Sequence, residues 1–255
     1  MSSSPLKKDL EEIGLQAVDK FITTFNSRNA DEWAESLNFP HVRPSPTGPI
    51  KVAITSASYV ENFDYQRILE TGWDHSEWDY KHLLHISKEK IHAAGQWSRY
   101  NTSGHKILTT PIVYIVTKMP VIDDYHWGIQ SRFGADYAAD EDTTDLESSA
   151  FKLIEQFIAH HNSGNTQRCA ELLNYPHFAV GIGEIEETSS TSEFELPSES
   201  ISIESMTVIQ AGNRSANISL DLNIGGAKRQ VVMNLTDREQ HFGIQAWSVL
   251  TPLDR

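Results

Sequence analysis

The sequence predicts an α+β protein made of two tandem domains of similar design. An internal repeat is the first observation: residues 21–41 match residues 157–177 at eleven of 21 positions without a gap. A second pair of matching segments, HWGIQSRF at 126–133 and HFGIQAWS at 241–248, comes later in each half. Each half also begins with apolar residues at helical spacing and continues with strand-like alternation. Helices followed by a sheet in each half indicate the α+β class.

The passage between the two copies gives the domain boundary. Residues 138–149 (AADEDTTDLESS) are acidic and lack apolar periodicity. We therefore predict a first domain over 1–137, an acidic linker over 138–149 and a shorter second domain over 150–255. The second copy is shorter by about twenty residues, and most of the deficit falls opposite residues 59–80 of the first.

Each domain is expected to open with a long amphipathic helix and a short second helix. The first helix is predicted from the apolar spacing of Leu10, Ile13, Ala17, Val18, Phe21, Ile22 and Phe25. The second helix is expected to carry Trp33 and Leu37 one turn apart. It is expected to end at Pro40, since the residue before a proline avoids helical geometry. LNFPH at 37–41 and LNYPH at 173–177 are therefore predicted to mark a helix-to-strand turn in each copy.

Strands are predicted for the rest of each domain. They cover residues 90–101, 107–119 and 126–137 in the first domain, and residues 214–224, 228–237 and 241–250 in the second. NTSG at 101–104 and GGA at 225–227 are expected to form hairpin turns. Pro111 predicts a sheet edge or a bulge, because proline cannot donate a ladder hydrogen bond.

Composition and charge exclude several classes of partner. The net charge is −14 and the pI is near 5.2, whereas binding to nucleic acid or to an anionic membrane needs clustered basic residues. The sequence shows no amino-terminal apolar signal region and no apolar run of membrane-spanning length. We expect a cytoplasmic protein that binds neither nucleic acid nor membranes.

Three motifs carry a resemblance to a known family. The pattern FxxxFNxRxADxWAxxLNFPHVR, the later TGWDHSxWD and the terminal WGIQxR resemble the SnoaL-like and DUF4440-like branch of the NTF2-like superfamily. The resemblance covers most of residues 10–137, and in the second copy the first helices and the last strand. It implies that each domain is a cone, in which a curved antiparallel sheet wraps around the N-terminal helices and encloses a pocket. It also implies either an intrachain pseudo-dimer or a homodimer.

Members of that superfamily include isomerases, dehydratases and cyclases that work without a cofactor, beside members that only bind or assemble. Such an enzyme needs an acid or base beside an apolar cavity, because burial moves a pKa toward neutrality. The candidates are Asp74, His75 and His41. The alternative for Asp74 is a structural cap or turn. The expected pocket wall is Trp78, Trp97, Tyr100 and Tyr114, with Tyr100 as a hydrogen-bond donor.

The repeated histidines favour a structural role. His177 occupies the place of His41 in a copy that lacks most of a counterpart to residues 59–80, so catalysis does not explain both histidines. We predict that Pro40, His41, Pro176 and His177 hold the turn, with a ring nitrogen bonded to a backbone carbonyl.

The last strand of the first copy carries a further hypothesis. Alternation places Trp127, Ile129 and Phe133 on the cone face, while the opposite face, which includes Gly128 and Gln130, packs one sheet against the other.

No metal or cofactor is expected. The histidine pairs at 82/85 and 160/161 lack partners at ligand spacing, and GIGEIE at 181–186 lacks the third glycine of a dinucleotide loop. Three functions remain open: binding of a small apolar molecule in the first domain, cofactor-free acid–base catalysis there, or assembly.

Overall fold

The computed structural model describes residues 5–45, 48–61, 63–138 and 141–253. Its first half contains four helices and six strands: α1 (Pro5–Asn26), α2 (Ala30–Ala34), β1 (Leu37–Arg43), β2 (Lys51–Ala53), α3 (Ser56–Glu61), α4 (Tyr65–Leu69), β3 (Trp73–Ile86), β4 (Lys90–Asn101), β5 (Lys106–Val121) and β6 (Asp124–Gly134). The second half contains α5 (Thr144–Asn162), α6 (Thr166–Ala170), β7 (Leu173–Val180), β8 (Ile185–Thr188), the 3-10 helix η1 (Thr191–Glu193), β9 (Ile201–Ala211), β10 (Ser215–Ile224), β11 (Ala227–Arg238) and β12 (His241–Leu250).

Each half forms one six-stranded sheet, and the two sheets have equivalent strand orders. The orders are β2-β1-β6-β5-β4-β3 and β8-β7-β12-β11-β10-β9. The prediction of an α+β fold is confirmed. We expected purely antiparallel sheets. Both sheets are mixed instead, because β1 runs parallel to β6 and β7 runs parallel to β12.

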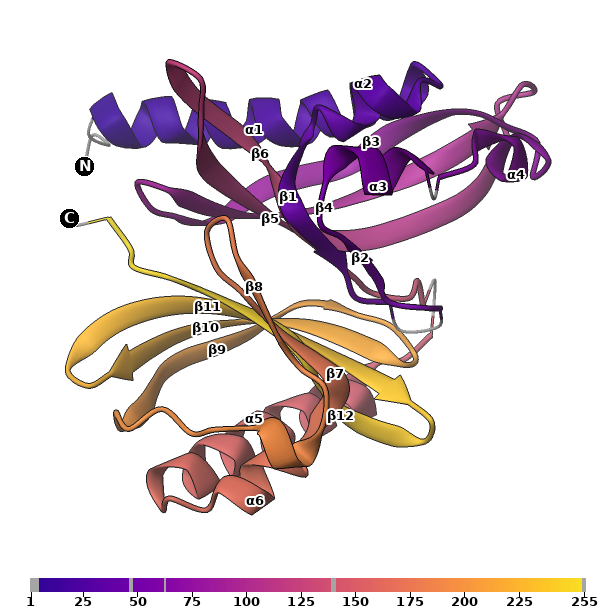
Figure 1. Ribbon diagram of the computed structural model, residues 1–255. Coiled ribbons are helices and arrows are strands. Elements are labelled where there is room, and N and C mark those ends of the chain that lie inside the picture. The colour runs from indigo at the N-terminus through magenta and orange to yellow at the C-terminus, as the bar shows by residue number, and fades with distance from the viewer. Residues whose placement is uncertain (1–4, 46–47, 62, 139–140, 254–255) are drawn as a thin grey trace.

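The helices lie on the outer faces of the two sheets, and the inner faces meet (Figure 1). Helix α1 buries the apolar face predicted for it against β4, β5 and β6. We call this the first core. Helix α5 buries an equivalent face against the second sheet. In the second half β8 and η1 stand where the first half has β2, α3 and α4, which accounts for the shorter second copy. Helix α5 begins at Thr144, inside the predicted linker, and residues 139–140 of that linker lie outside the described residues.

A third hydrophobic cluster fills the seam between the sheets. Its buried members are Val42, Ala94, Val113, Ile115 and Phe133 from the first half and Phe178, Val180, Val232 and Ala246 from the second. Hydrogen bonds cross the same seam. The Lys90 ammonium donates to the carbonyl oxygens of Val180 (2.7 Å) and Val249 (3.0 Å), and the Gln210 amide donates to the carbonyl oxygen of Gly95 (2.8 Å).

The repeated LNFPH and LNYPH segments are strands and not helix ends. Helix α2 already stops at Ala34, and Pro40 lies inside β1 after a cis peptide bond. Pro176 has the same place in β7 and is also preceded by a cis peptide bond. The prediction that Pro40 ends the short helix is therefore wrong, because this segment pairs with neighbouring strands.

A β-bulge at Gln130 changes the predicted faces of β6. Ile115 pairs with Ser131 and Val116 pairs with Ile129, so the residue between them has no partner and the alternation shifts. Ile129 faces the first core as predicted, whereas Phe133 lies in the seam. The Gln130 side chain does reach the second half, accepting a hydrogen bond from the Gly183 amide (2.9 Å). The register of β11 and β12 shifts in the same way around Gln245.

None of the described helices is long and apolar enough to cross a membrane.

Candidate functional site

Some side chains of the repeat form a hydrogen-bond network that both halves share. In the first half the Asn38 amide donates to the backbone (2.7 Å) and hydroxyl (2.9 Å) oxygens of Thr117, and Asn38 Oδ1 contacts His126 Nδ1 (2.8 Å). The Thr117 hydroxyl donates to Gln130, whose amide in turn donates to the Pro40 carbonyl oxygen. All these contacts lie between strands, so the network holds β1 to β5 and β6.

The second half repeats this network atom for atom. The Asn174 amide donates to the Thr236 hydroxyl (3.0 Å), and Asn174 Oδ1 contacts His241 Nδ1 (2.9 Å). The Thr236 hydroxyl donates to Gln245, and the Gln245 amide donates to the Pro176 carbonyl oxygen. Because both halves keep these residues, the network belongs to the scaffold and does not distinguish one half from the other.

The predicted acid–base pair lies at the rim of the first sheet. Asp74 and His75 belong to β3, the last strand of the sheet order, and both side chains are more than a third exposed. Asp74 accepts hydrogen bonds from His75 (2.9 Å) and Arg28, and these contacts, led by the one with His75, hold the Asp74 pKa below its usual value. Solvent exposure leaves this pair without the apolar surroundings that acid–base catalysis needs.

The four predicted wall residues divide between two faces of the sheet. Trp97 and Tyr114 are buried in the first core, and Trp78 packs against it. Tyr100 lies three residues beyond Trp97 on β4, which places it on the opposite face. There its ring stacks on His75 at 5.3 Å. The structure therefore separates Tyr100 from the other three.

His41 is buried, and one of its ring nitrogens contacts a backbone carbonyl oxygen, as predicted. This carbonyl belongs to the neighbouring strand and not to a turn. His41 Nδ1 lies 2.9 Å from the Ile129 carbonyl oxygen on β6. A carbonyl only accepts, so Nδ1 carries the proton and Nε2 is left to accept from Arg132 Nε at 3.4 Å. Burial, followed by the Arg132 charge, lowers the His41 pKa well below 6.5. His41 is therefore neutral at neutral pH, and its lone pair faces a cation.

Arg132 is the charged residue at the centre of the first core. The side chain is 4% exposed, and its guanidinium donates to the Tyr59 hydroxyl at 3.1 Å. The guanidinium carbon also lies 4.9 Å from the Phe21 ring centre and 5.4 Å from that of Trp33, in cation–π geometry. Helix α3 supplies Tyr59, and the second half has no counterpart of this helix.

Two more arginines approach the same region. Arg43 follows Val42, which pairs with Ser131, so Arg43 and Arg132 are neighbours on adjacent strands. Arg99, from β4, lies 5.4 Å from the Phe25 ring centre. Burial, followed by the charge of Arg132, lowers the pKa of both Arg43 and Arg99 to about 10. We call Arg43, Arg99 and Arg132 the cationic cluster.

No carboxylate compensates this cluster among the described residues. None of the ion pairs formed there includes any of the three arginines. Arg43 and Arg99 are only partly buried, so solvent reaches the cluster at these two side chains. A charge taken from water without a counter-ion costs free energy. In a chain of net charge −14, three arginines without a carboxylate partner among the described residues concentrate positive charge at one place.

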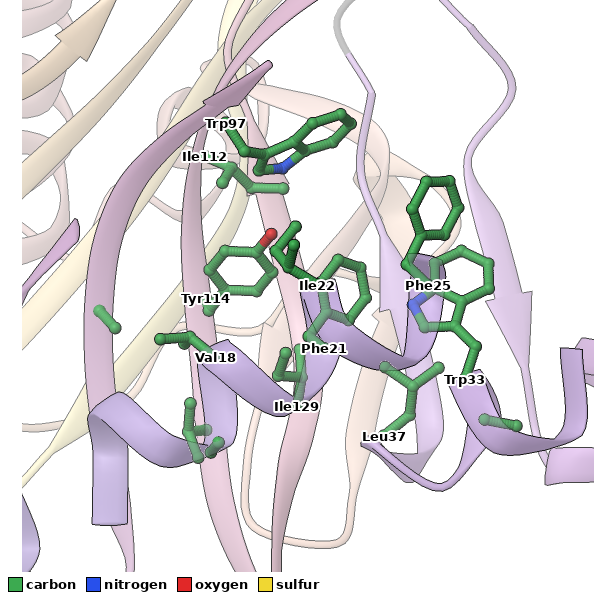
Figure 2. Packing of buried hydrophobic residues seen from close by; sticks show 14 of the residues in the cluster. Val18, Phe21, Ile22, Phe25, Trp33, Leu37, Trp97, Ile112, Tyr114 and Ile129 are labelled. Carbon is green, nitrogen blue, oxygen red and sulfur yellow. The ribbon is translucent and has the colours of Figure 1, made fainter. Parts of the chain in front are cut away.

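Hydrogen-bond donors without acceptors surround the cluster. The buried side-chain atoms that lack a partner among the described residues include Nε1 of Trp33, Nε1 of Trp78 and Nε of Arg99. The Trp97 indole and the Tyr114 hydroxyl form a side-chain hydrogen bond with each other. Figure 2 shows the indole of Trp97 above the ring of Tyr114, with the Tyr114 hydroxyl turned toward it. Most buried polar groups in proteins are satisfied, so a concentration of unmet donors in one core calls for an acceptor.

The second half fills the equivalent positions with apolar residues. Counting from the shared threonines Thr117 and Thr236, Tyr114 corresponds to Met233. The paired strands then relate the remaining positions. Arg43, Arg99, Arg132 and Trp97 correspond to Ala179, Ile224, Trp247 and Leu222. Trp247 packs against the His177 ring at 4.1 Å, and His177 Nε2 has no hydrogen-bond partner. The two halves thus share a scaffold but differ in the chemistry of their cores.

Our sequence-based candidates did not include the cationic cluster. The repeat alignment contained part of the signal, because it sets Arg132 against Trp247 and Arg43 against Ala179. No sequence signal connected Arg99 to these two, since strand pairing and the curvature of the sheet bring it to α1.

Two surface clefts lie away from this site, where the halves meet. They measure about 440 and 570 Å³, and both are lined by Lys90 and Glu184. The Lys90 ammonium already donates to two carbonyl oxygens, which is a structural role. Within the described ranges no group of three or more His, Cys, Asp or Glu side chains is arranged to hold a metal ion.

Comparison with known proteins finds similar solved structures only. No protein-family model matches the chain. No curated protein matches it either. Solved structures similar to this chain include an NTF2-like protein of unknown function from Shewanella oneidensis MR-1, at 18% identity and a TM-score of 0.38, which aligns with 49% of this chain and 98% of its own. A ketosteroid isomerase-like protein from Erwinia carotovora atroseptica SCRI1043 aligns with 51% of this chain and 96% of its own, at 15% identity and a TM-score of 0.38.

An NTF2-like protein of unknown function from Pseudomonas putida KT2440 aligns with 44% of this chain and 89% of its own, at 11% identity and a TM-score of 0.37. Each match thus covers about half of this chain. These structures include NTF2-like proteins, the superfamily that the sequence resembles.

Proposed function

We propose that the first core binds a small organic anion, and that the second half is a scaffold that stabilises the first. The observation that carries this proposal is the cationic cluster, in which three arginines have no carboxylate partner among the described residues. An anionic group of a ligand supplies the missing charge and accepts the unmet hydrogen bonds. Arginine suits this role because its planar fork matches a carboxylate in two parallel hydrogen bonds.

The aromatic surroundings define the rest of the ligand. Phe21, Phe25 and Trp33 lie beside the guanidinium groups and form an apolar surface for a carbon skeleton. This refines the small apolar molecule expected from the sequence, because an uncharged molecule leaves the arginines unpaired. Lys51 adds a further positive charge near the cluster. Burial lowers the Lys51 pKa most, and the charges of Arg43 and Arg132 lower it as well, so Lys51 lies within their electrostatic field. Such a field draws anions toward the site.

Binding is better supported than acid–base catalysis. The imidazole in the core, His41, is held neutral and accepts from Arg132. The Asp74–His75 pair is exposed at the sheet rim. A general base of the expected kind is a carboxyl group whose pKa is raised by an apolar site. The pKa of Asp74 is lowered instead.

The proposed scaffold role includes an intrachain pseudo-dimer. The seam cluster buries apolar side chains from both sheets, and Lys90 and Gln210 bond across it. The apolar packing of the seam and of the second core offsets the cost of the arginines in the first core, since the second half buries no charged side chain among its described residues.

Titration of the protein with benzoate, followed by calorimetry, tests the proposed function. Benzyl alcohol serves as the uncharged comparison of similar shape. We expect benzoate to bind at least tenfold more tightly, because hydrogen bonds between charged partners contribute about 1.5–3 kcal/mol. Arg132→Met should weaken benzoate binding by a similar factor.

Arg168→Met provides the matched control. Arg168 lies on the surface of the second half, where it pairs with Glu171, and its replacement removes the same charge far from the first core. Equal affinity for benzoate and benzyl alcohol, or equal weakening by both arginine replacements, contradicts the proposal.

A further inference from the structure

We propose that the ligand is a short organic dianion, such as a dicarboxylate, with one carboxylate held by Arg132 and Arg43 and the other by Arg99. This inference rests on the proposed function and names the class of ligand. It follows from the separation of the guanidinium groups along helix α1, from their number, and from the unmet donors beside each of them.

The guanidinium groups of Arg132 and Arg99 lie over successive turns of α1. Arg132 is placed over Phe21, and Arg99 is placed over Phe25. These rings are four residues apart, which corresponds to roughly 6 Å along a helix axis. The two cations therefore form two separate attachment points and not a single fork.

The number of charges indicates the charge of the ligand. Three arginines contribute three positive charges, and none has a carboxylate partner in the described part of the chain. A monoanion leaves two of these charges uncompensated, whereas a dianion leaves one. Arg43 is electrostatically coupled to both Arg132 and Arg99, so a second negative charge relieves repulsion throughout the cluster.

Each attachment point has a further hydrogen-bond donor. Tyr59 accepts from Arg132, so its hydroxyl proton is free to be donated near that guanidinium. At the other point, Arg99 lies 5.6 Å from the Trp97 ring, and the Arg99 Nε lacks an acceptor among the described residues. Two oxygen-rich groups, one at each end of a short chain, satisfy both sets.

Calorimetric titration of the full-length protein with glutarate and with pentanoate tests the inference. Both have five carbon atoms and differ by one carboxylate. We expect wild-type protein to bind glutarate at least tenfold more tightly. Arg99→Met should abolish this preference because it removes the second attachment point, whereas Arg132→Met should weaken the binding of both acids. Thermal melting of each variant verifies folding, and Arg99→Lys, which keeps the charge, should retain part of the preference.

The outcomes separate this inference from the proposed function. If wild-type protein binds the two acids equally, the ligand is a monoanion and only the inference is overturned. The same holds if Arg99→Met weakens both acids equally, since one carboxylate then bridges the two arginines. If benzoate, pentanoate and glutarate all fail to bind, the proposed function fails and the inference fails with it.

Discussion

At the scale of single residues, the two halves differ in the side chains that occupy equivalent positions of their cores. Arg132 and Trp247 occupy the same position of the repeat, and each packs beside the histidine that both halves keep. A tryptophan there completes an apolar core, whereas an arginine adds a buried charge. Buried unpaired charge lowers stability, so its presence in the first half is a cost that the proposed binding function would offset.

Arg99→Met should therefore raise the free energy of unfolding of the ligand-free protein by about 1 kcal/mol. The gain from removing an unsatisfied buried donor is about 1–3 kcal/mol, and the lost cation–π contacts offset about 0.5–1 kcal/mol of it. Methionine also keeps apolar contact with Phe25 and Trp97. Urea denaturation measures the change. The exposed control Arg168→Met should stay within about 0.5 kcal/mol of wild type. A marked loss of stability in Arg99→Met would show that the arginine is structural.

At the scale of secondary-structure elements, local patterns predicted the long first helix of each half and the hairpin turns, but they misplaced the end of the short second helix. The predicted strand over 90–101 coincides with β4, and Gly225 and Gly226, both with positive φ, make the two-residue turn between β10 and β11. Pro111 lies where pairing of β5 with β6 ends, since that ladder begins at Ile112. Strands β3 and β9 were not predicted, because their exposed polar residues obscure the alternation.

Gly128 is the residue that allows β6 to approach β1. A Cβ atom there would lie 2.8 Å from Asn38 Oδ1 and 2.9 Å from the Leu37 carbonyl carbon. Gly128→Ala should lower the free energy of unfolding by about 2–3 kcal/mol, because backbone and the Asn38 network must shift. Chemical denaturation of this variant beside Gly134→Ala provides the comparison. A Cβ at Gly134 meets no atom within 4 Å, so that variant should be near neutral. Similar losses in both variants would contradict the close-approach argument.

At the scale of the whole molecule, buried histidines join the two halves. His85 Nδ1 lies 2.9 Å from His92 Nδ1, and their Nε2 atoms contact the hydroxyls of Ser219 (2.9 Å) and Ser248 (3.0 Å) from the second half. Burial lowers the His85 pKa to about 4, with Asp221 opposing the shift, and lowers the His92 pKa well below 6.5, with His85 and Lys90 adding to the effect.

Acid should therefore weaken the folded protein in a definite pH window. In the unfolded chain His85 takes up a proton below about pH 6.5, whereas in the folded protein it does so only below about pH 4. The stability that neutral His85 contributes is therefore fully present above pH 6.5 and is lost as the pH falls from 6.5 to 4. For His85 alone we expect about 2 kcal/mol between pH 7 and pH 5. His85→Gln should reduce the pH dependence by about this amount in urea denaturation, whereas the exposed control His105→Gln should not. Parallel curves for wild type and His85→Gln would refute this assignment.

The sequence by itself determined the repeat, the succession of helices and strands, and the resemblance to NTF2-like proteins. These are properties of residues close together in the chain, where periodicity and turn chemistry act. Tertiary structure decided which side chains meet. The bulge at Gln130 moved Phe133 from the expected cone face to the seam, and sheet pairing brought Arg43, Arg99 and Arg132 to one place. Their convergence depends on strand register and sheet curvature, which no local pattern encodes.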